Sequence, residues 1–178
     1  PKGGTVDPRT TGRIMAFDVG ETVNDFSNNV IPDTLREGGR FVVSGDVTTR
    51  RSVALFEGTD HYGRLQPMLG TVADGSLLWD ESEYPITENP ELDDVEVWEV
   101  YNTTPDAHPI HLHLVTFEVL ERQKIKYDLI EKEMTSHDGE PASGFFIENE
   151  KTIGQPTPAH PWEQGPKDTI IVYPDEVV

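Results

Sequence analysis

Short runs of β-branched and aromatic residues, separated by turns that contain glycine or proline, recur along this chain of 178 residues. Such runs are typical of β-strands. The clearest is residues 95–102 (VEVWEVYN), and further strands are expected at residues 13–19, 51–57, 65–69, 76–79 and 168–173. The only helical feature expected is a short turn near residues 130–134. Many short strands joined by turns predict an all-β domain, either an antiparallel sandwich or a barrel.

A longer strand is expected at residues 111–122, because apolar residues stand on both of its faces. Val115 and Val119 alternate with Leu114 and Leu120 along it. A strand that is apolar on both faces is typical of the interior of a sandwich. Residues 125–167 contain glycine, proline and charge throughout, so a long loop is expected there.

The domain boundaries follow from the same pattern. Residues 1–12 carry no periodic apolar positions and are interpreted as a linker or the tail of a preceding domain, whereas residues 13–178 are interpreted as one domain. The chain stops as Val177 and Val178 begin another apolar run, and no basic-then-apolar leader follows Pro1. We therefore expect a piece of a longer protein, lacking the last strands of its domain. No apolar run is long enough to span a membrane.

Charge and cysteine content exclude several kinds of chemistry. The net charge is −19, and the 14 lysines and arginines do not cluster, which argues against nucleic acid as a partner. The chain has no cysteine, so it contains no disulfide, no thiolate nucleophile and no zinc–thiolate site. Neither feature determines the compartment in which the protein works.

Three of the six histidines fall within the six residues 108–113 (HPIHLH). In a strand, His111 and His113 would point to the same face, because side chains alternate with a period of two. Pro109 restricts the backbone after His108 and favours a turn that directs His108 elsewhere. Neutral imidazole is a ligand for copper, zinc, iron and nickel. The run therefore predicts ligands for more than one metal centre; the alternative is a polar strand end with histidines near solvent.

The segment 108–120 (HPIHLHLVTFEVL) resembles the histidine segment in the last cupredoxin domain of multicopper oxidases, above all bacterial laccases of the spore-coat type and bilirubin oxidases. Residues 7–17, 97–102 and 167–170 resemble other parts of the same domain. The resemblance implies a cupredoxin-like Greek-key β-sandwich, incomplete at its C-terminus, as the third domain of a three-domain enzyme. It also suggests an exported, periplasmic or spore-coat location.

The resemblance further implies copper as cofactor, with His108 at the type 1 copper, His111 at the type 2 copper and His113 at a type 3 copper. Enzymes of this family oxidise phenolic or similar reducing substrates and reduce dioxygen to water. The implied partners are the small-molecule donor, dioxygen and the remaining cupredoxin domains. This chain lacks the family's His-Cys-His segment, so we expect it to be inactive alone. Phe145, Phe146 and Trp162 are expected either to contact the donor or to pin their segment to the domain.

Two alternatives belong to other classes. His111, His113 and Glu118 resemble the metal motif of cupins, which bind a single metal, but Glu118 has the opposite strand parity to the histidines. Pro105 and Ile125 stand where cupins have glycine. The other alternative is a metal-free binding module with a cupredoxin-like fold.

Overall fold

The computed structural model describes residues 7, 15, 17, 18, 20, 21, 30–34, 37, 38, 43–78, 86–136 and 138–178. The chain divides into two compact units, Pro1–Arg40 and Phe41–Val178. The described residues of the first unit belong to no helix or strand. The predicted boundary after residue 12 and most of the predicted strand at 13–19 lie outside the described residues.

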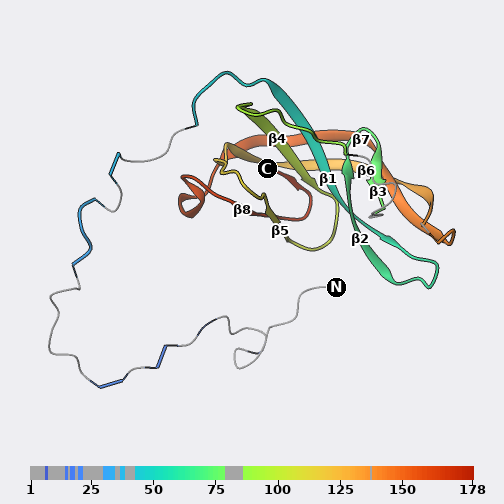
Figure 1. The fold of residues 1–178 in the computed structure, drawn as a ribbon. Helices are drawn as coiled ribbons and strands as arrows, with labels where there is room; N and C mark the ends of the chain where they lie inside the picture. Colours follow the sequence, from blue (N-terminus) through green and yellow to red (C-terminus); the bar gives the residue numbers. More distant parts are fainter. Residues whose placement is uncertain are drawn as a thin grey trace. The chain divides into compact units, whose positions relative to one another are not determined.

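Most of the second unit is a seven-stranded sheet with the order β3-β2-β1-β4-β9-β6-β7 (Figure 1). Its strands are β1 (Thr49–Thr59), β2 (Leu65–Thr71), β3 (Gly75–Leu77), β4 (Glu96–Asn102), β6 (Glu121–Thr135), β7 (Pro141–Pro158) and β9 (Glu176–Val177). β1 runs parallel to β4 and antiparallel to β2. One further pair, Thr59 with Ser143, joins β1 to β7, so the sheet closes on itself like a barrel.

A second, two-stranded sheet carries the first two histidines of the motif. β5 (His108–His111) pairs antiparallel with β8 (Thr169–Val172), and Figure 1 shows the two strands side by side. In this register His108 lies opposite Val172 and His111 opposite Thr169. A short 3-10 turn, η1 (Pro161–Glu163), comes before β8.

The alternation of side chains along β1 divides the hydrophobic core in two. Ala54 and Phe56 face one cluster, which also holds Ile125 of β6. Leu55 faces the other, which holds Val172 of β8. Because neighbouring residues of a strand point to opposite faces, one strand serves both cores. The small sheet is thus held against the face of β1 opposite to the hairpin of β6 and β7.

Two predictions for residues 125–167 are wrong. The segment is mainly a long antiparallel hairpin of β6 and β7 rather than a loop, and residues 130–134 lie in β6 rather than in a helical turn. Ile125, Tyr127 and Leu129 pack against the first core, whereas the residues between them are charged. The hairpin therefore buries one face and exposes a charged face to solvent. The segment is polar on average, so its composition alone does not indicate strands.

The predicted strand at residues 111–122 is also wrong. β5 ends at His111, residues 112–120 belong to no strand, and β6 begins at Glu121. Leu114 has a φ of 66°, a left-handed conformation that a strand does not allow. Leu114, Val115 and Leu120 are exposed, so their apolar character does not reflect an interior strand.

The all-β fold class and the strands expected at 51–57, 65–69, 95–102 and 168–173 are confirmed, with bounds that shift by a few residues. Leu77 ends β3, and Trp79 lies outside the described residues. Among the described residues, the structure contains no helix that is long and apolar enough to cross a membrane.

Candidate metal site

The four-residue strand β5 places its two terminal histidines in different surroundings. His108 borders an apolar pocket together with residues of β1 and β2, whereas His111 lines a separate open depression together with His113. The direction of His108 therefore differs from that of the other two histidines, but the turn predicted at Pro109 is wrong, because Pro109 lies inside β5, opposite Ile171. His108 and His111 are three positions apart in β5, so the alternation of side chains directs them to opposite faces, and His113 follows in an irregular segment.

The rings of His111 and His113 lie together. Their centroids are 4.9 Å apart and their planes cross at 67°. Nδ1 of His111 lies 2.9 Å from the backbone oxygen of Asp168 and 2.9 Å from Oγ1 of Thr169. A backbone carbonyl only accepts hydrogen bonds, so Nδ1 of His111 carries the proton and Nε2 keeps a free lone pair. Both side chains are exposed, which leaves this lone pair accessible.

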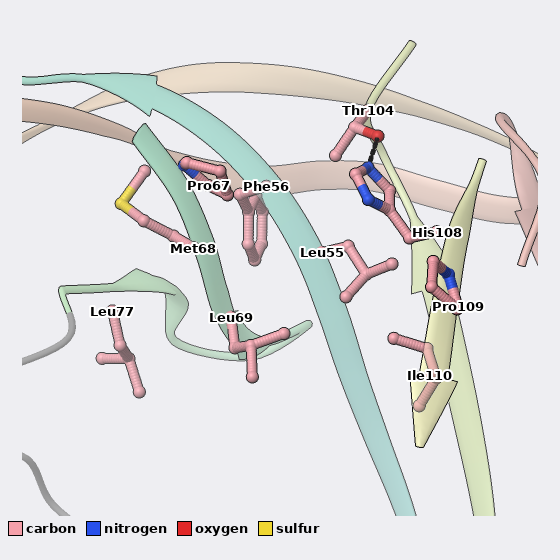
Figure 2. Close-up of a pocket in the computed structure, with 10 residues that line it drawn as sticks. All are labelled: Leu55, Phe56, Pro67, Met68, Leu69, Leu77, Thr104, His108, Pro109 and Ile110. Carbon is pink, nitrogen blue, oxygen red and sulfur yellow. Dashed lines mark hydrogen bonds between the residues drawn. The ribbon is translucent and has the colours of Figure 1, made fainter. Parts of the chain in front are cut away.

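The ring of His108 is held from the opposite side of β5. Its Nε2 lies 2.6 Å from Oγ1 of Thr104 and 3.7 Å from Oε1 of Glu57. Figure 2 shows this ring at the edge of the apolar pocket, with Thr104 beside it. The pocket has a volume of about 230 Å³. Its lining residues come from β1, β2, β3, β5 and the turn before β5: Leu55, Phe56, Pro67, Met68, Leu69, Leu77, Thr104, His108, Pro109 and Ile110.

Asn102, at the end of β4, organises the turn that leads to His108. Its side chain is fully buried, and its Nδ2 donates to the backbone oxygens of Asp106 (2.8 Å) and Val172 (3.0 Å). Its Oδ1 accepts from both the backbone N–H and the hydroxyl of Thr104, each at 2.9 Å. Every hydrogen-bonding atom of the amide is thereby used. Sequence reasoning missed Asn102 and Thr104, although Asn and Thr directly after a strand are typical of such local turn networks.

A buried charge cluster supports the strand that pairs with β5. Arg122 of β6, whose side chain is 2% exposed, forms ion pairs with Glu163 of η1 and Glu176 of β9. Its Nη2 also donates to the backbone oxygen of Ile171 in β8, at 2.9 Å. Burial lowers the pKa of Arg122, but hydrogen bonds to the two carboxylates outweigh this effect and raise it above its ordinary value. β8, and with it the register of β5, is therefore anchored by a charge that stays ionised.

The three histidines provide donor atoms that suit copper, but three imidazoles are too few to complete the coordination of a copper centre. Imidazole nitrogens are ligands that copper prefers, and His111 and His113 converge on one depression. In the part of the chain that the structure describes, no group of three or more His, Cys, Asp or Glu side chains is arranged to hold a metal ion. The described residues thus offer one side of a copper site and do not complete such a site by themselves.

The aromatic residues of the 125–167 segment have separate roles. Phe145 packs against the first core, so it pins the hairpin to the barrel. Phe146 is 40% exposed and lies beneath Nζ of Lys132, 4.8 Å from the ring centroid. Trp162 is exposed and stacks on His160. The structure therefore does not gather these three side chains around His108.

Comparison with known proteins identifies the family. A family model described as multicopper oxidase matches residues 58–178. The chain is 32% identical over 176 residues to a laccase of Bacillus stratosphericus and 31% identical over 176 residues to a laccase of Bacillus subtilis (strain 168). It is 31% identical over 130 residues to the multicopper oxidase LPR1 homolog 5 of Oryza sativa subsp. japonica, a match that covers 71% of this chain and 19% of that protein.

The two laccase matches cover 99% of this chain but 30% of each laccase, so the chain spans less than a third of the length of these relatives. The histidine run lies inside the matched region, and the all-β, barrel-like fold is that of a cupredoxin-like domain. The family implies copper, and it decides against the cupin interpretation of His111, His113 and Glu118. The chain belongs to the multicopper oxidase family.

Proposed function

We propose that this chain is the third, copper-binding cupredoxin domain of a laccase-like multicopper oxidase. The complete enzyme would oxidise phenolic or similar reducing substrates and reduce dioxygen to water. The laccases and the plant multicopper oxidase that it resembles support this class of reaction. In this proposal His108 is a ligand of the type 1 copper, His111 of the type 2 copper and His113 of a type 3 copper.

One observation carries the assignment: a single short strand presents His108 to one environment and His111 to another. β5 pairs with β8 over its whole length, so the two histidines are fixed in relation to one another by the same ladder of hydrogen bonds. His108 borders the apolar pocket, and His111 joins His113 at the exposed depression. Two separate directions are what two separate copper centres require of one segment.

Bound copper would supply the one-electron steps that connect donor oxidation with dioxygen reduction. The task of this chain is to position ligands. Asp168 and Thr169 orient the ring of His111, so that its Nε2 faces outward. Such secondary contacts fix the orientation of a metal-binding histidine and typically change metal affinity by roughly 10–100-fold when they are removed.

Copper binding to the chain itself tests the assignment of His111 and His113. Electron paramagnetic resonance of the chain titrated with Cu²⁺ should show nitrogen coupling from imidazole ligands. The variants His111→Ala and His113→Ala should each lose part of this coupling and bind copper more weakly. His61→Ala is the matched control, since His61 is a histidine of the exposed turn between β1 and β2. Unchanged coupling in both variants would contradict the assignment.

The chain alone should not consume dioxygen in the presence of a phenol and copper, because one histidine for each copper type, and no cysteine, leaves each proposed copper without most of its ligands. Copper-dependent oxidation by the chain alone would contradict the proposed division of the enzyme into domains. Absence of any specific copper binding would favour the remaining alternative, a metal-free binding module.

A further inference from the structure

We propose that Thr104, held in place by Asn102, is the positioning residue that fixes the ring of His108, keeping its proton on Nε2 and leaving Nδ1 as the donor atom for metal. The role of Nδ1 as a metal donor rests on the proposed function. The hydrogen-bond arrangement itself belongs to the metal-free chain, so it is tested separately.

The orientation of the Asn102 amide is set by its neighbours. One end of the amide faces two backbone oxygens, those of Asp106 and Val172, at 2.8 and 3.0 Å. Backbone oxygens only accept hydrogen bonds, so this end must be the NH₂ group. The other end is therefore the oxygen, which accepts from the backbone N–H and the hydroxyl of Thr104. The amide cannot rotate without losing all four bonds.

This arrangement determines where the hydroxyl proton of Thr104 goes. Oγ1 of Thr104 lies 2.9 Å from Oδ1 of Asn102 and 3.1 Å from the backbone oxygen of Asp106, and both of these atoms only accept. The single hydroxyl proton is engaged by them, so Oγ1 turns a lone pair toward His108. The contact of 2.6 Å to Nε2 of His108 is then a bond in which the imidazole N–H donates.

Charge and burial reinforce this arrangement. Oε1 of Glu57 lies 3.7 Å from Nε2 of His108, and a carboxylate near this edge of the ring favours an N–H over a lone pair there. Thr104 is 3% exposed and Asn102 is fully buried, so water cannot replace either partner. Asn102 also binds the backbone of Val172, the residue that pairs with His108 in the small sheet. The same amide thus fixes both the strand and the ring that it carries.

Nuclear magnetic resonance of the metal-free chain tests the proposal. At about pH 8.5, where histidine is ordinarily neutral, the ¹⁵N shifts of His108 should show a proton on Nε2. Its exchange with water should be roughly tenfold slower than that of His61, as a bond of ordinary strength requires. Thr104→Val removes the hydroxyl at nearly constant volume and should abolish this protection. Thr104→Ser should restore it.

Thr103→Val is the matched control. Thr103 is also buried, but its hydroxyl donates to the backbone oxygen of Leu55, at 2.6 Å, and not to a histidine. This variant should lose stability and keep the His108 signal. Backbone amide spectra establish that each variant is folded. A proton on Nδ1 of His108 in the unsubstituted chain, or a His108 signal that is the same in Thr104→Val, would overturn the proposal.

The two proposals fail separately. A protected Nε2–H on His108, lost in Thr104→Val and regained in Thr104→Ser, supports the positioning role even if copper titration shows no imidazole coupling. In the reverse case, His111 and His113 bind copper but the Nε2–H of His108 is unprotected. This result would support the domain assignment and contradict the positioning role of Thr104.

Discussion

The imidazole rings of His111 and His113 meet edge to face, 4.9 Å apart, although β5 ends between them. The two rings therefore do not owe their common direction to strand alternation. The conformation of the irregular segment that follows β5 brings the second ring back beside the first. Directly after the pair, Leu114 adopts a left-handed conformation with a φ of 66°.

A β-branched residue at position 114 should disturb this conformation. The side chain of Leu114 is fully exposed, so Leu114→Val loses no packing, and any cost arises in the backbone. A non-glycine residue in a sparsely populated conformation costs about 1–3 kcal/mol, and β-branching adds to it. We expect lower stability in urea denaturation and weaker copper binding by the pair. Leu92→Val, at another exposed leucine without a left-handed φ, should change neither.

Removal of the buried cation should be among the most damaging single changes. Arg122→Met leaves Glu163 buried without its cation and leaves Glu176 with only the exposed Lys124, 3.8 Å away; breaking a buried pair in this way costs about 3–5 kcal/mol. Urea denaturation measures the loss. The triple variant Arg122→Met, Glu163→Gln, Glu176→Gln should regain part of it, because no unpaired charge remains. A triple variant less stable than the single one would contradict this explanation.

The same cluster should make the fold sensitive to acid. Burial raises the pKa of Glu163, but hydrogen bonds from Arg122 and the backbone of His160 outweigh this and hold it below its ordinary 4.5. A lowered carboxyl pKa contributes stability that is present above pH 4.5 and is lost as the pH falls through the value in the folded protein. Thermal unfolding midpoints measured from pH 7 down to about 3 should fall less steeply in Glu163→Gln than in the unsubstituted chain.

Glu150 of β7 should show the opposite dependence. Burial, together with the negative charge of Glu99, raises the pKa of Glu150 above 4.5. Its ionisation is therefore unfavourable in the folded chain, and stability falls as the pH rises from 4.5 through the folded value. Glu150→Gln should raise the thermal midpoint at pH 7 and leave it nearly unchanged in acid. Glu148→Gln, at an exposed position of the same strand, serves as the control.

The closure of the barrel should depend on Gly58. A Cβ atom at this position would lie 1.9 Å from the backbone oxygen of Ser143, beside the single pair that joins β1 to β7. Because the nearest atom belongs to the backbone, it cannot move away as a flexible side chain could. Gly58→Ala should therefore lower the free energy of unfolding by at least about 1–3 kcal/mol, the usual range for overpacking. Gly20→Ala places its Cβ in open space and should have no measurable effect.

The sequence predicts the strands whose residue types match their burial. β4 and β8 are rich in β-branched residues and contribute to both the ladder and the core. The hairpin of β6 and β7 escapes prediction because charged residues alternate with its buried residues, such as Ile125, Tyr127 and Leu129. The apolar positions are therefore hidden in a segment whose composition is mainly polar. A charged, glycine-containing segment is equally typical of a loop.

The candidate site shows a similar division. The three histidines are visible from their spacing and residue type, since imidazole is chemically distinctive. The residues that hold the histidines in place cannot be recognised in the sequence, because their hydrogen bonds join distant positions. Asn102 bonds Val172, 70 positions away, and Arg122 bonds Glu163, 41 positions away. Asparagine, threonine and glutamate are also common on surfaces, and only the fold shows that these ones are buried and paired.

In the part of the chain that the structure describes, β9 is the shortest strand of the barrel and consists of Glu176 and Val177. They pair with β4 on one side and β6 on the other. The residues on either side of β9 extend this join, because Val178 exchanges two backbone hydrogen bonds with Val100 of β4, and Asp175 bonds Asn102 of β4 and Ile125 of β6. A local fluctuation that frees residues 175–178 would therefore expose amides of both β4 and β6 to hydrogen exchange. These four terminal residues thus join β4 to β6 in the barrel wall, and the ion pair of Glu176 with Arg122 strengthens the join.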